Sequence, residues 1–290
     1  MNLCVYTVLL GGYEALNEQP IAADSGIPFI CFTDNPDSRS DSWQIRHIEP
    51  VLACDLVRSQ RWPKLRPHAL LGEFDASIYI DNTVILTKPP AEIWAALVPE
   101  DASLALLRHS HRDTVAGEFS VVRAQGLDEP GRIDEQLEHY MTTAPEVLAT
   151  APHWGAILLR RHDAAVAAFA DIWSAHVMRY CRRDQLSLNM ALHLSGLTPA
   201  VHNIDNGRSW FHQWPVSTGR KRELRVLGAP STTNERLTRF EKLVDKPHEL
   251  ERTNRELLAR LEALEGSRSW RLTAPLRGVN AILHRLAKGK

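Results

Sequence analysis

Ser77-Ile78-Tyr79-Ile80-Asp81-Asn82-Thr83 combines an apolar, β-rich run with an acid and an amide at its end. The run predicts a buried strand, and the ligand crevice of an open α/β sheet lies beyond the carboxyl ends of its strands. Asp81 and Asn82 are therefore candidates to face a ligand. A carboxylate on a rigid strand end suits a divalent cation, which in turn binds a diphosphate. The alternative is that Asp81 only forms a turn or caps a helix, the commoner role of a single aspartate after a strand.

Further strand-like runs lie on both sides of this segment. They alternate with helical or turn-rich stretches, which predicts a sheet with helices against its faces, an α/β fold. Several runs also end in polar or glycine residues, so their ends belong to the same expected crevice. A long helix is expected over 163–179, and another starts at Asp184. The predicted strands are 3–10, 28–33, 43–48, 104–107 and 155–159, and the polar ends are Gly11-Gly12, Asp34-Asn35-Pro36 and Arg108-His109.

Composition and charge give no sign of a nucleic-acid-binding, zinc-binding or membrane-spanning protein. The 290 residues are 44% hydrophobic and 24% charged, which is ordinary for a soluble globular chain. A formal net charge of -1 gives no whole-molecule attraction to nucleic acid or to a membrane. The four cysteines, Cys4, Cys31, Cys54 and Cys181, form no zinc-like pattern, and buried free thiols are expected for those in apolar runs. Without a signal-peptide pattern or an apolar run long enough to cross a bilayer, a cytoplasmic location is expected.

Three cations recur at helical spacing before the central strand. Arg58, Arg61 and Lys64 lie at positions i, i+3 and i+6, and His68 follows one turn later. Cations on one helix face can bind a pyrophosphate. The alternative is a solvent-exposed basic helix face, which the spacing fits equally well.

Polar clusters also follow the later strands. His109, Arg112, Asp113 and Glu118 offer a general base and groups that bind hydroxyls. Asp184 stands where a helix begins, so capping is the simplest role of that residue taken alone. Gln185 follows it, and His202 and Trp210 add a further polar group and an aromatic face of the kind that binds sugar rings or bases.

The character of the chain changes after about residue 225, where charges become dense. Leucines recur every seven residues at Leu243, Leu250, Leu257 and Leu264, with Asn254 at an expected core position. This pattern predicts a coiled-coil segment over 226–265, with a homodimer through 240–264. An amphipathic helix folded onto the preceding domain explains it equally well, because a proline at position 247 interrupts the first heptad.

The last stretch, 266–290, is basic and amphipathic. It carries six arginines and lysines and no acid, with Trp270 near its start and leucines on one helical face. Such a helix is typical of a membrane-surface anchor, which predicts a peripheral position at the inner face of the plasma membrane. The alternative is a solvated helix packed against its own coiled coil.

The order of these segments resembles the TOD/MUCI glycosyltransferase-like family, once a domain of unknown function, found in plants and bacteria. The resemblance runs from residue 6 to about 214 and becomes specific because many short blocks occur in one order. The tail from Ser267 to Arg277 also resembles one that follows coiled coils in bacterial enzymes of surface-polysaccharide assembly. The family blocks are Tyr6-Thr7, Gly11-Gly12-Tyr13-Glu14, 29–35, Arg58, Arg61, Lys64, Pro67-His68, Tyr79-Ile80-Asp81, His109, Arg112-Asp113, Glu118, Gln136, Tyr140 and 183–187.

The resemblance implies a GT-A-like domain over 1–225 that transfers a sugar from a nucleotide donor to a surface-polysaccharide or glycolipid acceptor. Asp81 stands where the family type places an aspartate-x-aspartate motif, but Asp81-Asn82-Thr83 has one carboxylate. A Mn²⁺ or Mg²⁺ cofactor is therefore expected at Asp81 only with help from another ligand, for which Asp34, Asp205 and a histidine such as His202 are the candidates.

The implied site divides into three groups of residues. Acceptor activation is assigned to Asp184 ahead of Asp113 and Glu118, and acceptor binding to His109, Arg112, Gln185 and Trp210. The donor is expected to contact Tyr6, Thr7, Gly11, Gly12, Tyr13, Asp34, Arg58, Arg61, Lys64, His68, Asp81 and Asn82.

Two other functions compete with this interpretation. Some plant relatives of the family are described as acting on ceramide, which makes a lipid hydrolase an alternative, although no Gly-x-Ser-x-Gly elbow is present. The second alternative is a scaffold without catalysis that keeps the fold and dimerises through its leucine repeat.

Overall fold

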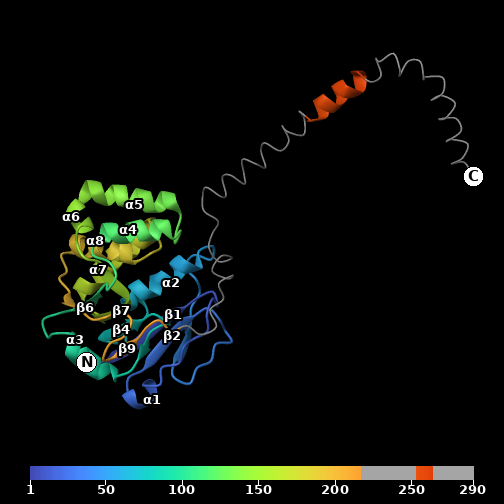
Figure 1. Cartoon of the computed structure of the whole chain (residues 1–290). Coiled ribbons are helices and arrows are strands. Elements are labelled where there is room, and N and C mark those ends of the chain that lie inside the picture. The colour runs from blue at the N-terminus through green and yellow to red at the C-terminus, as the bar shows by residue number, and fades with distance from the viewer. Residues whose placement is uncertain (217–252, 264–290) are drawn as a thin grey trace, which may run out of the picture. The chain divides into compact units, whose positions relative to one another are not determined.

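Seven strands form one mixed sheet in the computed structural model, which describes residues 1–216 and 253–263 (Figure 1). The chain divides into two units, Met1–Pro230 and Ser231–Lys290. The strands of the large sheet are β1 Leu3–Leu9, β2 Phe29–Thr33, β3 Gln44–His47, β4 Ala76–Ile80, β6 Leu104–Arg108, β7 His153–Arg161 and β8 Ala200–His202, and β5 Ile85–Leu86 pairs with β9 His212–Gln213 in a small second sheet.

The order of the large sheet is β3-β2-β1-β4-β7-β6-β8. β1, β2, β3 and β4 are parallel, and β7 lies antiparallel between β4 and β6. Because β4 and β6 are both antiparallel to β7, they run in the same direction. The carboxyl ends of β1, β2, β4 and β6 therefore share one edge, as the polar strand ends predicted.

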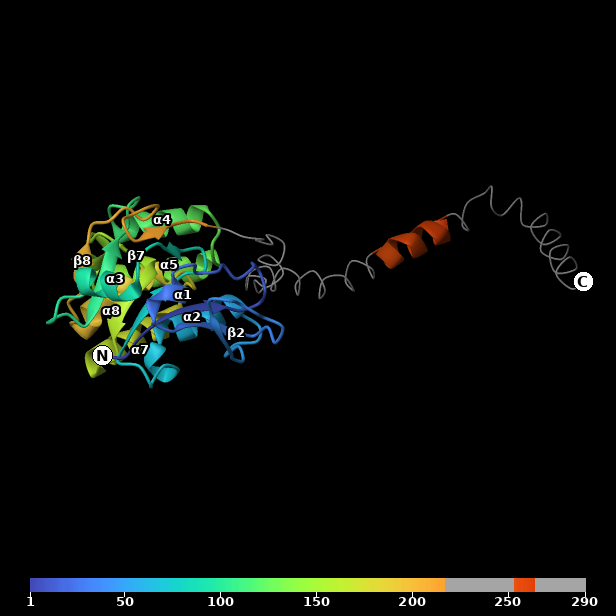
Figure 2. The same ribbon diagram turned by 90° about the horizontal axis from the view of Figure 1, so that it is seen from below.

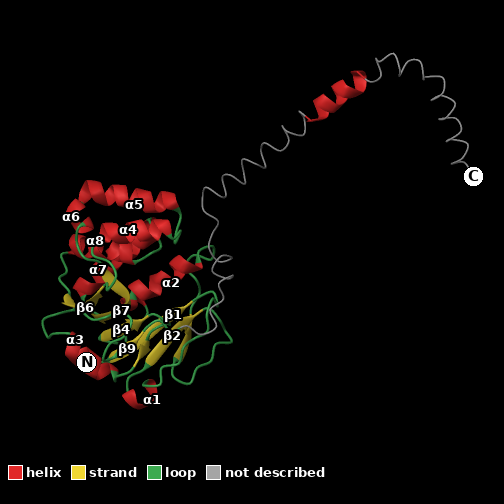
Figure 3. Cartoon of the chain, viewed as in Figure 1, coloured by secondary structure: helices red, strands yellow, loops and turns green. Residues whose placement is uncertain are grey.

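Helices cover both faces of the sheet, as Figures 1 and 3 show. The predicted α/β mixed sheet flanked by helices is the architecture observed, and the six predicted strands agree with β1, β2, β3, β4, β6 and β7. The helices are α1 Ala22–Ser25, α2 Leu56–Leu65, α3 Pro90–Leu97, α4 Val115–Ala124, α5 Pro130–Thr143, α6 Pro145–Leu148, α7 Ala164–Arg179 and α8 Gln185–Ser195, with a 3₁₀ turn at Pro67–Ala69.

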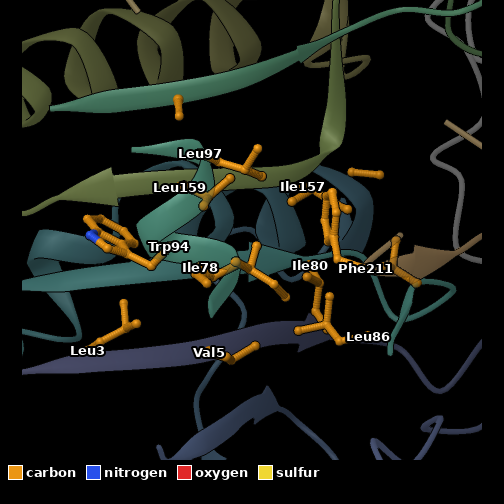
Figure 4. Close-up of a cluster of buried hydrophobic side chains, with 14 of the residues drawn as sticks. Leu3, Val5, Ile78, Ile80, Leu86, Trp94, Leu97, Ile157, Leu159 and Phe211 are labelled. Carbon is orange, nitrogen blue, oxygen red and sulfur yellow. The ribbon is translucent and has the colours of Figure 1, made fainter. Parts of the chain in front are cut away.

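Alternate residues of each central strand supply two separate cores. One side chain set, with Val5 and Ile78, packs against Trp94 and Leu97 of α3 (Figure 4). The opposite set, with Tyr6 and Tyr79, packs against helices α2, α7 and α8. This two-sided burial explains why β1 and β4 read as nearly continuous apolar runs.

A third core lies among helices α4, α5, α6 and α8. Val115, Phe119, Ile133, Tyr140 and Leu186 are all buried in it. Helices α4 and α5 lie next to each other in the views of both Figure 1 and Figure 2. Helix α8 joins two layers, since Leu188 packs toward the sheet and Leu186 toward the outer helices.

The second unit is described only over residues 253–263, which are helical. Leu257 and Leu261 there are about half exposed, at 54% and 50%. The coiled-coil segment predicted over 226–265 lies largely outside the described residues, and the tail over 266–290 lies wholly outside them. In the described ranges no helix has the length and apolar character needed to span a membrane. Cys4 and Cys31, which lie in apolar runs, are buried free thiols as predicted; Cys181 is also a buried free thiol, and Cys54 is an exposed one.

Candidate functional site

A cavity of about 390 Å³ opens at the shared carboxyl edge of the strands. It lies between the loop after β1, helix α2, the end of β4, strand β7 and the start of α8. Its polar lining comprises Gly11, Tyr13, Glu14, Gln60, Arg61, Lys64, Asp81, Asn82, Thr83, Gln125, Arg183, Asp184 and Gln185, and its apolar lining comprises Leu10, Leu56, Val57, Leu127, Trp154, Gly155, Ala156, Trp214 and Pro215.

Asp81 is held on one side and open on the other. Its Oδ1 accepts hydrogen bonds from the Tyr79 hydroxyl at 2.6 Å and from Lys64 Nζ at 3.2 Å. Burial, followed by the charge of Asp81, raises the pKa of Tyr79 well above its usual value, so the hydroxyl stays protonated and donates. The Asp81 side chain is 33% exposed, while that of Lys64 is 2% exposed. The carboxylate is therefore fixed in orientation and still reaches the cavity.

Asp184 lies behind Asp81 in a buried network of charges. Lys64 Nζ is 2.7 Å from its Oδ2, and Arg61 Nε is 3.5 Å from its Oδ1. Burial alone raises the pKa of this carboxyl, but the charges of Arg61 and Lys64 outweigh it and hold the pKa well below the usual range. Lys64 thus links two carboxylates, one buried and one in the cavity.

This pairing corrects our expectation that Asp184 caps helix α8. Its side chain makes no capping hydrogen bond, because both oxygens turn toward the cations of α2. It also weakens the assignment of Asp184 as the base for the acceptor. A carboxylate with a depressed pKa, paired through both oxygens, is a poor proton acceptor at neutral pH.

Gly155 of β7 makes room for the network. A Cβ at this position would lie 3.4 Å from Asp184 Oδ2 and 3.7 Å from Lys64 Nζ. The start of α8 and the end of the Lys64 side chain therefore approach the sheet where β7 has no side chain.

Helix α2 is fixed at both ends, which positions Arg61 and Lys64. At its start, Asp55 accepts from Arg58 N at 3.0 Å. At its end, the buried Arg160 of β7 donates to the carbonyls of Lys64 and Leu65 at 2.8 and 3.2 Å. These carbonyls belong to the last turn, where the helix itself provides no donor.

Two residues that were predicted to bind the nucleotide donor, Tyr6 and Arg58, instead help to hold helix α2 and do not line the cavity. Tyr6 is buried, and its hydroxyl donates to the Lys64 carbonyl at 2.8 Å and accepts from Arg160. Arg58 is buried between Asp55 and Asp128, at 2.5 and 3.2 Å. The basic face proposed for α2 is therefore neither solvent-exposed nor uniform, since Arg58 points to structural carboxylates and the other two cations point to the site.

The loop after β1 forms another wall. Gly11 N donates to both oxygens of Asp34, at 3.0 and 3.1 Å, and its φ of 79° is one that glycine adopts readily. Gln60 of α2 donates to the Tyr13 hydroxyl at 3.0 Å. Asn82 donates to Glu14 at 3.1 Å, which ties this loop to the end of β4. Asp34 and Asn82 thus shape the wall, while Gly12 is exposed and Thr7 is buried below it, both outside the lining.

The candidates for acceptor binding are divided between the cavity and its surroundings. Gln185 lines the cavity, whereas the remaining acceptor candidates do not. Glu118 is buried and paired with Arg112 at 3.0 Å, and its pKa is raised because burial outweighs the nearby arginines. Burial lowers the pKa of His109 to about 4, so its ring is neutral at physiological pH. Asp113 and Trp210 are exposed, and His68 lies 3.5 Å from Asp171.

Several lining residues escaped the sequence analysis. Glu14 and Arg183 belong to the family blocks but received no role. Gln60 and Trp154 gave no signal of their own, although Trp154 forms an edge-to-face pair at 5.3 Å with Trp214 in the cavity wall.

The site offers a divalent cation one protein carboxylate, Asp81, and no cluster of protein ligands among the described residues. Asp81 offers a hard oxygen ligand, and Mg²⁺ commonly binds through one or two carboxylates plus substrate phosphates. Over 1–216 and 253–263, no group of three or more His, Cys, Asp or Glu side chains is placed to hold a metal ion. One suggested second ligand, His202, is on β8 with Nε2 2.7 Å from the Leu97 carbonyl, and it does not line the cavity. Asp81 therefore suits a cation that takes its other ligands from substrate and water.

Comparison with known proteins agrees with the resemblance in the sequence. The family model described as the TOD1/MUCI70 glycosyltransferase-like domain matches residues 32–202, more than half of the chain. Among curated proteins, the chain is similar to "Probable hexosyltransferase MUCI70" of Arabidopsis thaliana, with 26% identity over 155 residues and 51% of this chain covered. The chain spans 27% of that relative's length.

Solved structures of two glycosyltransferases are also similar at low identity. The apo structure of the bifunctional glycosyltransferase WbbM has a TM-score of 0.42 and 11% identity, covering 70% of this chain and 38% of its own. Core-mannan synthase A of Aspergillus fumigatus, in its Mn/GDP form, has a TM-score of 0.44 and 7% identity, covering 70% and 72%. The family match, and the order of blocks that carries it, lead to one assignment: this chain belongs to the TOD1/MUCI70 glycosyltransferase-like domain family.

Proposed function

We propose that the chain transfers a sugar from a nucleotide-sugar donor to a saccharide acceptor of the surface-polysaccharide or glycolipid class. The observation that carries the proposal is Asp81, which reaches a cavity at the carboxyl edge of the sheet and is fixed there by Tyr79 and Lys64. Family membership and the name of the plant relative, a probable hexosyltransferase, support the same reaction class.

The site can stabilise the leaving group of the reaction through its charges. Departure of a nucleoside diphosphate leaves negative charge on its phosphates, and cations placed in advance stabilise that charge. Lys64, which lies 3.2 Å from Asp81, and Arg61, which contacts Asp184, provide positive charge in the cavity lining. A Mn²⁺ or Mg²⁺ ion bound by Asp81 and the donor phosphates would supply further stabilisation of the leaving group. The aromatic wall of Trp154 and Trp214 offers a face for a sugar ring or base.

A thermal-shift screen with nucleoside diphosphates tests this function. A ligand that binds only the folded protein stabilises it, by about 2.7 kcal/mol at a hundred times its Kd. We expect at least one nucleoside diphosphate to raise Tm by several degrees, and the matching nucleotide sugar to be consumed. No shift with any of them would favour the scaffold, and release of free lipid without nucleotide would favour the hydrolase.

We also propose that the protein is cytoplasmic and that residues 266–290 attach it to the inner face of the plasma membrane. The support is the basic, amphipathic sequence of this stretch. Deleting 266–290 should release the protein from anionic vesicles in a sedimentation assay and leave donor turnover unchanged. Equal sedimentation of the truncated and full-length proteins would contradict the proposal.

A homodimer through 240–264 remains part of the proposal. Its support is the leucine repeat and the half exposure of Leu257, Leu258 and Leu261 in the helix over 253–263.

A further inference from the structure

Most cations around the cavity already have a carboxylate partner. Lys64 lies between Asp81 and Asp184, and Arg61 contacts Asp184. Beyond the cavity, Arg112 is paired with Glu118. Since these ion pairs are internal to the protein, part of the positive charge of each is compensated before any ligand binds.

Arg183 differs from all of them. It lines the cavity at the turn before α8, half-buried, and in the described part of the chain no carboxylate lies within ion-pair distance of its guanidinium. Among the described residues, its guanidinium donates one side-chain hydrogen bond, to Gln185 Oε1 at 3.3 Å. Its Nε is shielded from solvent, and no described residue accepts a hydrogen bond from it. A shielded N–H donor without an acceptor is costly unless a ligand completes its hydrogen bond.

The backbone around Arg183 is fixed in advance. Arg182 N donates to Asp128 at 2.7 Å, and the buried Trp173 donates through Nε1 to the Asp184 carbonyl at 2.8 Å. Arg183 therefore leaves the chain between two anchored residues. Because this backbone is already fixed, less conformational freedom is lost when the side chain binds an anion.

Its neighbour provides a natural contrast. Arg182 is also half-buried, but its Nε lies 3.5 Å from Asp128 and donates to the Leu127 carbonyl at 3.2 Å. The two adjacent arginines thus have different partners: Arg182 is satisfied by the fold, while Arg183 faces the cavity.

We infer that Arg183 binds the diphosphate of the nucleotide donor in the cavity that Asp81 also lines. The inference rests on the proposed function and adds a residue to its binding site. A guanidinium donates two parallel hydrogen bonds to phosphate oxygens, which fits a group with several free donors better than a paired one. The positive charge of Arg183 also acts over this region, since it contributes to the lowered pKa of Asp184.

Calorimetric titration of full-length Arg183→Gln and Arg182→Gln tests the inference. The probes are pyrophosphate, the nucleoside diphosphate chosen by the thermal-shift screen, and the corresponding nucleoside without phosphate. Loss of a charge-assisted pair should weaken diphosphate and pyrophosphate binding by Arg183→Gln roughly tenfold to a hundredfold. Nucleoside binding should stay at the wild-type level, and Arg182→Gln should bind all three probes as the wild type does.

The outcomes separate this inference from the proposed function. If the wild type binds the diphosphate and Arg183→Gln binds it equally well, Arg183 is not a phosphate ligand and only the inference fails. If Arg183→Gln loses affinity for the nucleoside as strongly as for the diphosphate, the residue shapes the cavity and the inference also fails. If the wild type binds no diphosphate, both fail. Arg183→Lys, which keeps the charge on a smaller head group, should restore part of the lost affinity and shows that the variant site is folded.

Discussion

Sugar transfer by Asp81→Asn should fall by about a hundredfold or more relative to the wild type. The amide cannot carry the negative charge that Asp81 presents to the cavity, so a cation bound together with the donor phosphates would lose its protein ligand. Tyr79 and Lys64 also face an altered partner, since they donate to Asp81 Oδ1 in the native protein. The measurement is the initial rate of transfer with the nucleotide sugar chosen by the screen.

The matched control is Asp75→Asn, at the opposite end of the same strand. Asp75 is exposed, and its carboxylate accepts from Asn2 N at 2.6 Å. This variant should keep the wild-type rate, which would show that the effect at residue 81 is local. Transfer by Asp81→Asn at the wild-type rate would remove the basis of the proposed mechanism.

Asp184→Asn should reduce the free energy of unfolding by about 3 to 5 kcal/mol, because it leaves buried cations without their partner. Lys64 and Arg61 both contact this carboxylate, and its side chain is 4% exposed. For comparison, Asp171→Asn removes an ion pair of Arg66 in which Asp171 is 54% exposed, and should cost less than about 1 kcal/mol. Chemical denaturation of the three proteins measures both changes.

The stability difference at Asp184 should also depend on pH. The pKa of this carboxyl is lower in the folded protein than in the unfolded chain, so its contribution is complete above the unfolded value of about 3.9. It is lost as the pH falls through that value toward the folded pKa. The gap between wild type and Asp184→Asn should therefore be constant near neutral pH and narrow below about pH 4. A gap that does not change with pH would show that Asp184 is not charged in the folded protein.

Local sequence patterns predicted the edge of the sheet well. The apolar runs ending in Gly11, Asp34, Asp81 and Arg108 are strands whose carboxyl ends share one edge. Each prediction needed only the residues of one run, because strand burial and strand ends are local properties. Strand β8 was missed, since it is only three residues long and not fully buried.

The ion pairs around Asp184 could not be predicted from local sequence patterns. Helical spacing brought Arg58, Arg61 and Lys64 together as one set, but the tertiary fold divides them, with Arg58 directed to Asp128. Residue 184 looked like a helix cap because its partners lie 120 and more positions earlier in the chain. For the same reason, the sequence could not distinguish Arg182 from Arg183, whose difference depends on which of them meets Asp128.

The most direct test of the central claim is a crystal structure of the protein with the nucleoside diphosphate that stabilises it. The account predicts density for both phosphates inside the 390 Å³ cavity, between Asp81 at the end of β4 and the turn before α8. Phosphate density elsewhere on the molecule, with Asp81 still contacting only Tyr79 and Lys64, would contradict it.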